Sequence, residues 1–210
     1  MPSLTWIVIA ITSLAASTTA APASLAERTV SPCPAPGKTT RVYSSGLYTI
    51  FPGTPKYAAP PNNDLHVQYN AETKLAIKQV AAFGEFPKAA KKCSLGWVQD
   101  DAKSGTLVVS GDGRLTARQL SGFPAFPAGG ENGVSAQDVQ RYDAGKVRKE
   151  ASPDFSGWDR EIRTAAHAAA GSNFTCATNM YVLLEKSNGT SGNVFMKKTK
   201  GSGVYIEFSC

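Results

Sequence analysis

The sequence predicts a mostly β protein over residues 41–210, an antiparallel β-sandwich of jelly-roll or Greek-key type with one or two short helices. Two observations predict it. Short runs of alternating apolar and polar residues recur along the chain, separated by clusters of turn residues, which is typical of half-buried antiparallel strands. The composition, with 42% hydrophobic and 18% charged residues among 210, is that of a globular protein with a single domain.

Residues 1–20 have the composition of a secretory signal peptide. They contain no charged side chain, and an apolar run from Leu4 to Leu14 is followed by small residues up to Ala20, after which we expect cleavage. The run is shorter than the membrane-spanning length of about 20 residues. Residues 21–40 are rich in alanine, proline, serine and threonine and are predicted to form a flexible tail. We therefore expect a secreted protein, extracellular or associated with the cell wall, without a membrane anchor.

The four cysteines all follow the predicted leader, and their even number predicts two disulfides formed in an oxidising compartment. They are Cys33, Cys93, Cys176 and Cys210. Three pairings are possible. No Cys-x-x-Cys pair is present, so a structural role is favoured over a zinc site, and we predict no metal and no cofactor. A bridge to Cys210 would hold the last predicted strand in place.

In the first half of the chain the alternation defines several strands. The runs 65–69 (LHVQY) and 93–97 (CSLGW) each place their odd-numbered residues on one face. The run 105–110 (GTLVVS) follows. The turn SGDGRL predicts a hairpin directly after it, because Asp112 and Gly113 tolerate positive backbone φ angles.

The C-terminal part of the chain predicts a three-stranded meander. Its strands are residues 180–185 (MYVLLE), 193–198 (NVFMKK) and 204–209 (VYIEFS), with turn segments between them. In the first and third runs the even-numbered apolar residues share one face. A slip of one residue would expose that face to water, so the pattern fixes the register.

Two short helices are expected in the middle of the chain. Ser135 and Asp138 have the spacing of a capping box, and Gly145 is a suitable stop signal. The alanine-rich segment between Asp159 and Gly171 predicts the second helix, with Asp159 as its cap.

The formal net charge of +6 belongs wholly to the chain after the leader. Small clusters of lysine and arginine would suit an acidic glycan or a phosphorylated surface, although scattered lysines also keep sheet proteins soluble and their edges apart. No nucleic-acid recognition motif is present, and we predict no nucleic acid partner. The pattern does not predict an oligomeric state.

Two N-glycosylation sequons lie in the exported part of the chain, at Asn173 (Asn-Phe-Thr) and at Asn188 (Asn-Gly-Thr). Asn188 falls at the tip of a predicted hairpin, where a bulky sugar can be accommodated. Asn173 lies close to Cys176. Both are predicted glycosylation sites.

No recognisable catalytic pattern is present, and no catalytic residue is predicted. The two histidines, His66 and His167, are far apart in the sequence, and there is no G-x-S-x-G elbow. The stretch PDFSGWDRE is the best candidate ligand site, because Trp158 offers a stacking surface between Asp154 and Asp159. Two such carboxylates could also serve a glycosidase if they lay about 5–10 Å apart. The alternative for Trp158 is a place in the core.

Several stretches together resemble a known family: the FGEFP strand followed by Cys93-x-Leu95, the late Cys176 leading into MYVLLE, and the closing GSGVYIEFSC. From about Val42 to Cys210, the chain resembles the fungal secreted proteins with the ubiquitin 3 binding protein (But-two) C-terminal domain. The resemblance implies a β-sandwich and supplies no catalytic residues. The family name implies binding to a ubiquitin-like protein, but such modifiers work in the cytosol and nucleus. That function therefore does not carry over to an exported chain.

These features predict a secreted, disulfide-stabilised, non-enzymatic β-sandwich that binds cell-wall polysaccharide or an extracellular protein. A secreted carbohydrate-active enzyme with a carboxylate pair is the first alternative. A secreted effector or antigen that binds a host protein is the second.

Overall fold

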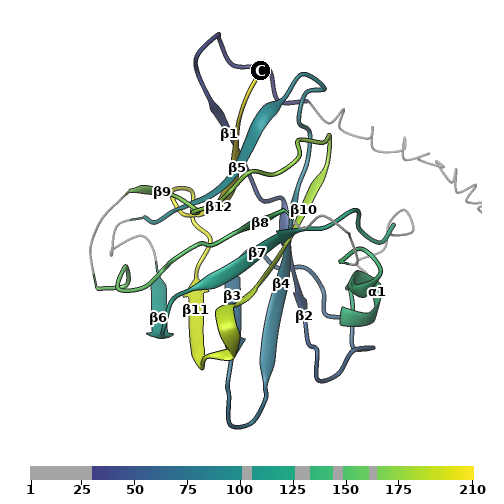
Figure 1. Ribbon diagram of the computed structural model, residues 1–210, viewed down its shortest axis with the longest axis vertical. Coiled ribbons are helices and arrows are strands. Elements are labelled where there is room, and N and C mark those ends of the chain that lie inside the picture. Colours follow the sequence, from purple (N-terminus) through teal and green to yellow (C-terminus); the bar gives the residue numbers. More distant parts are fainter. Residues whose placement is uncertain (1–29, 101–105, 126–132, 144–148, 161–164) are drawn as a thin grey trace, which may run out of the picture.

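The computed structural model describes residues 30–100, 106–125, 133–143, 149–160 and 165–210 (Figure 1). The predicted leader and its cleavage site lie outside these residues. Within the described residues, the regular elements are β1 (Thr40–Tyr43), β2 (Gly46–Ile50), β3 (Leu65–Tyr69), β4 (Ala76–Phe83), β5 (Lys91–Val98), β6 (Leu107–Gly111), β7 (Leu115–Gln119), α1 (Ala136–Gln140), β8 (Glu150–Ala151), β9 (Ala166–Ala168), β10 (Met180–Lys186), the 3-10 turn η1 (Ser187–Gly189), β11 (Gly192–Met196) and β12 (Gly203–Ser209).

The strands form two antiparallel sheets, which confirms the predicted fold class (Figure 1). The smaller sheet has the strand order β1-β12-β5-β9. The larger has the order β6-β11-β3-β4-β10-β7-β8, and β2 pairs with β4 outside this path. Because β10 occupies one edge of β4, both β2 and β3 use the other edge, and the larger sheet forks there.

Gln79 of β4 holds the fork together. Its side chain is fully buried. Its amide nitrogen donates to the Thr49 hydroxyl on β2 (3.1 Å) and to the backbone oxygen of Asp64 (3.1 Å). Its amide oxygen accepts the backbone N–H of His66 on β3 (2.7 Å). Because a buried amide is tolerated only when it is hydrogen-bonded, these contacts specify where the two strands diverge.

The main core lies between the two sheets and is built from the faces that the alternation predicts. Burying one large apolar side chain in this way stabilises a fold by about 1.5–3 kcal/mol. The predicted inward residues of three strands are all buried there: Cys93, Leu95 and Trp97 of β5, Met180, Val182 and Leu184 of β10, and Val204, Ile206 and Phe208 of β12. On β3, Leu65 and Val67 are buried in the same core, whereas Tyr69 is half-buried and lies outside it.

The outer face of the larger sheet is partly covered by α1, which begins where the capping box predicts. The Ser135 hydroxyl accepts the backbone N–H of Asp138 (3.2 Å), and the Asp138 carboxylate accepts the backbone N–H of Ser135 (3.1 Å). Val139 is buried against Leu183 of β10 and its neighbours in a second apolar cluster. The helix ends at Gln140, and the predicted stop at Gly145 lies outside the described residues.

The predicted C-terminal meander is wrong. β10 pairs with β4 and β7, β11 pairs with β3 and β6, and β12 pairs with β1 and β5 in the other sheet. The strand β10 buries Val182 on its inner face and Leu183 on its outer face, so it lies in the middle of the larger sheet. Alternation specifies which residues face the core, but it does not specify which strand lies alongside.

The predicted hairpin at SGDGRL is also wrong, because β6 and β7 are not paired. β6 pairs with β11 at the edge of the larger sheet, and β7 pairs with β10 and β8. The positive φ in the turn belongs to Gly111 (68°) and not to Asp112 or Gly113. The ammonium group of Lys186 lies at this turn and donates to the backbone oxygens of Asp112 (2.6 Å) and Arg114 (2.9 Å).

Two further local expectations fail for tertiary reasons. The alanine-rich segment predicted to be a helix contains the strand β9, in which His167 lies opposite Trp97 of β5 with the two rings stacked at 3.9 Å. Sheet pairing and ring stacking here override the helix propensity of alanine. In the FGEFP stretch, the strand ends at Phe83 and Glu85 has a positive φ of 69°.

Both predicted disulfides are present, with the pairing Cys33–Cys210 and Cys93–Cys176. The first joins the segment before β1 to the residue after β12. In that segment, the Ser31 N–H also donates to the backbone oxygen of Glu85 (2.8 Å). This part of the predicted tail is therefore attached to the sandwich.

Candidate binding groove

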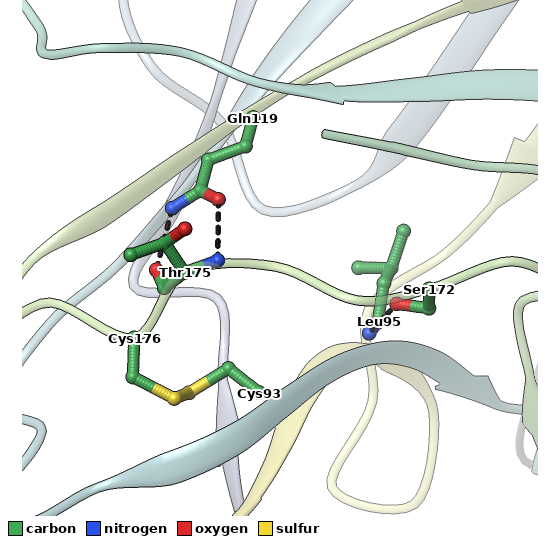
Figure 2. Close-up of a disulfide and its surroundings, with 6 residues drawn as sticks. All are labelled: Cys93, Leu95, Gln119, Ser172, Thr175 and Cys176. Carbon is green, nitrogen blue, oxygen red and sulfur yellow. Dashed lines mark hydrogen bonds between the residues drawn. A yellow bond between two sulfur atoms is a disulfide. The ribbon is translucent and has the colours of Figure 1, made fainter. Parts of the chain in front are cut away.

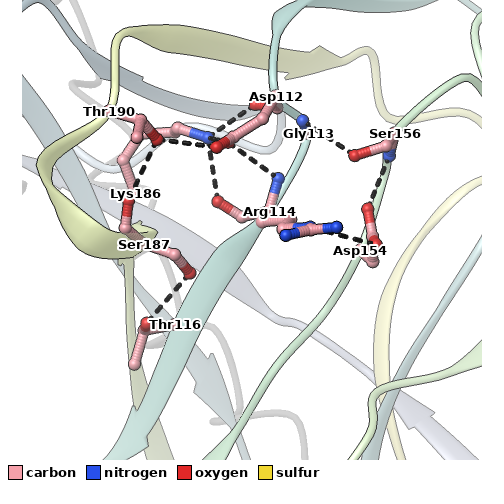
Figure 3. Close-up of polar contacts among 9 residues, drawn as sticks. All are labelled: Asp112, Gly113, Arg114, Thr116, Asp154, Ser156, Lys186, Ser187 and Thr190. Atoms are coloured by element: carbon pink, nitrogen blue, oxygen red, sulfur yellow. Dashed lines mark hydrogen bonds and ion pairs between the residues drawn. The ribbon is translucent and has the colours of Figure 1, made fainter.

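The two acids predicted to flank a ligand are both used in local contacts, and Figure 3 shows those of Asp154. The Asp154 carboxylate accepts the backbone N–H of Ser156 (2.9 Å) and lies 3.7 Å from the guanidinium nitrogen of Arg114. The Asp159 carboxylate accepts the backbone N–H of Val109 on β6 (3.3 Å). The two carboxylates therefore support turns and a strand edge.

Trp158 lies against the main core, as the alternative reading of this residue states. Its ring contacts Trp97 edge-on at 5.9 Å and His167 at 4.0 Å, and Trp97 also stacks on Phe155 at 4.4 Å. Burial lowers the pKa of His167, which favours the neutral imidazole. The structure thus brings the predicted tryptophan and a histidine together, within an aromatic cluster at the end of the sandwich.

The sequon that begins at Asn173 ends at Thr175, next to Cys176 of the disulfide Cys93–Cys176 (Figure 2). Asn173 is exposed, whereas the next residue, Phe174, is buried and donates its backbone N–H to the oxygen of Cys93 (3.0 Å). The Thr175 backbone is fixed by Gln119, whose side-chain amide donates to the Thr175 oxygen (2.7 Å) and accepts its N–H (2.8 Å). Asn173 is therefore accessible to solvent, and its glycosylation stays a prediction.

The second sequon lies on the turn η1, next to a cluster of polar contacts (Figure 3). The Thr190 hydroxyl donates to the Asp112 carboxylate (2.6 Å). Lys186, whose side chain is 2% exposed, forms an ion pair with the same carboxylate. Burial by itself would raise the pKa of Asp112, but hydrogen bonds from Lys186 and Thr190 outweigh it and lower the pKa. The cluster clamps the β6–β7 turn to the end of β10.

Two adjoining hollows lie on the outer face of the larger sheet, beside α1, and share Asn179 and Tyr181. We call them together the aromatic groove. The first hollow has a volume of about 340 Å³ and is lined among others by Arg118, Gln119, Tyr142, Asp143, Lys149 and Thr175. The second has a volume of about 700 Å³ and is lined among others by Tyr43, Ser45, Tyr48, Gly84, Glu85 and Phe123.

A row of three aromatic rings lines the groove. Phe123 lies between Tyr181 of β10, on which it stacks at 4.7 Å with the planes 8° apart, and Tyr48 of β2, which is 4.8 Å away. All three rings are half-buried and lie over the second apolar cluster. Burial raises the pKa of Tyr48, which keeps its hydroxyl protonated at neutral pH. The row presents apolar ring surface next to hydroxyl groups.

An ion network forms the polar floor of the first hollow. The guanidinium of Arg118 donates to the two oxygens of Asp143 (3.0 and 2.9 Å) and also contacts Glu185, which in turn pairs with Lys78 (2.5 Å). Burial opposes the charge on Arg118, but the hydrogen bonds from it to Asp143 and Glu185 outweigh this and raise its pKa. Of this network, Arg118 and Asp143 line the first hollow, and Lys149 adds a second cation to its lining.

The opposite end of the groove is formed by residues 84 and 85. A side chain at Gly84 would place its Cβ 3.1 Å from the amide oxygen of Asn179, so glycine leaves this amide room to line both hollows. Glu85 follows with its positive φ of 69° and is half-buried. The second hollow thus offers aromatic rings, one amide and one carboxylate.

Sequence reasoning missed this groove. Tyr48, Phe123 and Tyr181 come from two strands and a loop that are distant in the sequence. One signal was present, since Tyr181 occupies the outward position between the inward residues Met180 and Val182. An aromatic residue on the outward face of a strand is a candidate ligand contact, but only the fold shows which other rings lie beside it.

Neither a metal centre nor a membrane-spanning segment is found in the part of the chain that the structure describes. No group of three or more histidine, cysteine, aspartate or glutamate side chains could hold a metal ion there. No helix among the same residues is long and apolar enough to cross a membrane.

Comparisons of the chain with family models, with curated proteins and with solved structures found no match. The sandwich fold is therefore assigned from the structure alone, and a function can be proposed only from the geometry of the groove.

Proposed function

We propose that this protein is an exported, non-catalytic binding protein whose aromatic groove holds a polysaccharide chain of the cell wall. The observation that carries the proposal is the row of Tyr48, Phe123 and Tyr181, which runs alongside Asn179 and Glu85. We also propose that the chain is related to the fungal secreted proteins with the But-two C-terminal domain, which its sequence resembles.

The chemistry of the groove supports a sugar ligand. A hexose ring has an apolar C–H face that stacks on aromatic rings, and hydroxyl groups at its rim that hydrogen-bond to amides and carboxylates. Each hollow is within the range of about 300–1,000 Å³ that is typical of ligand sites. Because the two hollows adjoin, an extended chain could occupy both.

Export is supported by the leader-like sequence and by the two disulfides, which form and persist in oxidising compartments. A binding role is favoured over hydrolysis because Asp154 and Asp159, the acids considered for a carboxylate pair, already accept hydrogen bonds from backbone N–H groups.

Retention on insoluble polysaccharides tests the proposal. The mature protein with its disulfides intact is mixed with chitin, β-1,3-glucan or cellulose, and the bound fraction is measured. We expect retention on at least one of them, and a loss of about tenfold or more in affinity for Tyr181→Ala and Phe123→Ala, because each removes a stacking surface.

Tyr57→Ala is the matched control. Tyr57 is 57% exposed and contacts Phe51, outside the groove, so its removal should leave retention unchanged. Equal losses for Tyr57→Ala and Tyr181→Ala would contradict the assignment of the groove. Retention of the wild type on none of the polysaccharides would contradict the function.

A further inference from the structure

We propose that Glu85 is the specificity-determining residue of the groove and selects neutral sugars over acidic ones. In this proposal, the Glu85 carboxylate accepts hydrogen bonds from neighbouring hydroxyl groups of one hexose unit and repels uronic acids and other anionic sugars. The inference rests on the proposed function and specifies its ligand class.

The backbone at Glu85 is the first observation. Lys74, Glu85 and Lys92 are the non-glycine residues with positive φ in the described part of the chain. Of these three, Glu85 is the one that lines the aromatic groove. Side chains other than glycine are strained in this conformation, and such strain persists only where the surroundings impose it, often at ligand sites.

The contacts around Glu85 hold its backbone in this positive-φ conformation. The backbone oxygen of Glu85 accepts the N–H of Ser31, in the segment that the Cys33–Cys210 bridge holds in place (2.8 Å). The next residue, Phe86, is buried and packs edge-on against Phe208 of β12 at 5.5 Å. The Glu85 carbonyl and the following residue are therefore held in place. A glycine would adopt the positive φ at this position without strain.

The Glu85 side chain is the second observation. It is half-buried at the second hollow, and its carboxylate has no hydrogen-bond or ion-pair partner among the described residues. An ionised carboxylate can accept about four hydrogen bonds. Glu85 lines the same hollow as Phe123 and Tyr48, so this capacity lies next to the proposed sugar-binding rings.

The charge of the second hollow is the third observation. Although the chain carries a net charge of +6, the described residues that line this hollow include no lysine or arginine, and Glu85 is the one carboxylate among them. Lys198 lies over the Tyr43 ring at 4.4 Å but does not line the hollow. A lone carboxylate against an anionic sugar leaves two like charges together, which is how binding sites reject competitors.

Binding of defined hexamers tests the proposal. The probes are laminarihexaose and chitohexaose, which are neutral, and hexagalacturonate, which is acidic. Calorimetry should show that the wild type binds a neutral hexamer and binds hexagalacturonate about tenfold or more weakly. Glu85→Gln should weaken binding of the neutral hexamer by about tenfold to a hundredfold, which is the scale of a lost charged hydrogen bond. It should also reduce the difference in affinity between the neutral hexamer and hexagalacturonate.

A glycine variant separates recognition from stability. Glu85→Gly should lose the same affinity while its Tm stays within about 2 °C of the wild type or rises, because the strained residue is replaced by an unstrained one. The matched control is Lys74→Gly, which relieves the same kind of strain at φ 58° outside the groove and should leave affinity unchanged.

Unchanged affinity for the neutral hexamer in both Glu85 variants overturns the inference. If Tyr181→Ala still loses binding in that case, the proposed function stands without it. Tighter binding of hexagalacturonate than of either neutral hexamer by the wild type overturns the inference as well. Binding of no hexamer by the wild type overturns both the inference and the proposed function.

Discussion

The carboxylate of Glu185 joins three strands. From its place on β10, it contacts Arg118 of β7 and Lys78 of β4 (2.5 Å), and its side chain is 16% exposed. Burial would raise the pKa of Glu185, but the hydrogen bonds from Lys78 and Arg118 outweigh it and lower the pKa. A carboxyl group whose pKa is lower in the folded state stabilises the fold above its unfolded pKa of about 4.3, and this stabilisation is lost as the pH falls through the folded value.

Glu185→Gln should therefore lower the free energy of unfolding by about 2 kcal/mol at pH 7, since it leaves Lys78 and the buried Arg118 without their shared partner. Between pH 5 and pH 3 the stability of the variant should fall less than that of the wild type. Urea unfolding at both pH values measures this. Glu207→Gln, which breaks the exposed pair with Arg41 (2.9 Å), is the control and should change stability by less than about 0.5 kcal/mol.

An equal loss between pH 5 and pH 3 for the wild type and Glu185→Gln would contradict the role of Glu185. Such a result would assign the acid sensitivity to other carboxylates with lowered pKa values, such as Asp112 and Asp138.

At the residue scale, contacts within one turn of the chain could be predicted from the sequence, whereas contacts between residues of different strands could not. Ser135 and Asp138 act within one turn of chain, so their capping box follows from spacing alone. Gln79 and Glu185 look like ordinary polar residues of a strand, and their roles arise from groups on other strands. The two disulfides follow from an even count of cysteines, whereas their pairing required the fold.

The strand β6 forms one edge of the larger sheet, and its outward backbone is partly blocked. The Asp159 carboxylate accepts the N–H of Val109 (3.3 Å), while the neighbouring Val108 is 46% exposed. Unpaired edges that carry apolar side chains are templates for pairing with another chain, and an inward-pointing charge is a common protection. Asp159 therefore serves the edge of the sheet.

Asp159→Ala should free this edge and increase self-association. Sedimentation velocity across a concentration series measures it, with an expected shift of the variant toward dimers or larger species at concentrations where the wild type stays unchanged. Asp154→Ala removes a carboxylate from the same loop without touching β6 and should behave like the wild type. Identical sedimentation of the two variants would contradict the protective role.

At the element scale, the sequence predicted which side of each strand is buried better than it predicted which strands pair with one another. The buried sets on β5, β10 and β12 follow directly from alternation, because one-sided burial requires a period of two residues. The meander and the hairpin failed because turn residues between strands permit a tight connection without requiring it. The strand β9 was hidden by alanine, whose helix propensity is weaker than the gain from pairing with β5.

The two disulfides act on the whole molecule in different ways. Cys33–Cys210 closes the longer loop, with a sequence separation of 177 against 83, but both of its cysteines are exposed. Cys93 is 1% exposed within the main core. Loop closure alone gives each bridge about 4–5 kcal/mol on the chain-entropy model, so the packing around Cys93 decides which matters more.

Removing the buried bridge with Cys93→Ala and Cys176→Ala together should cost at least about 1 kcal/mol more than Cys33→Ala with Cys210→Ala, because it also leaves a cavity. Guanidinium unfolding of the two double variants gives the comparison. A larger loss for the Cys33 and Cys210 variant would show that loop length outweighs packing in this sandwich.

At the scale of the molecule, the sandwich was predictable because burial patterns are summed over many strands. The groove was not, because it depends on how β2, β4 and β10 lie together and on where the loop with Phe123 crosses them. Trp158 was predicted to stack on a ligand because of its large aromatic ring, but in the fold this ring packs against Trp97 and the main core.

The bridge from Cys33 to Cys210 encloses both β1 and β12, which form a pair in the smaller sheet. Tension applied between these two cysteines is borne by a covalent bond and does not shear β1 from β12.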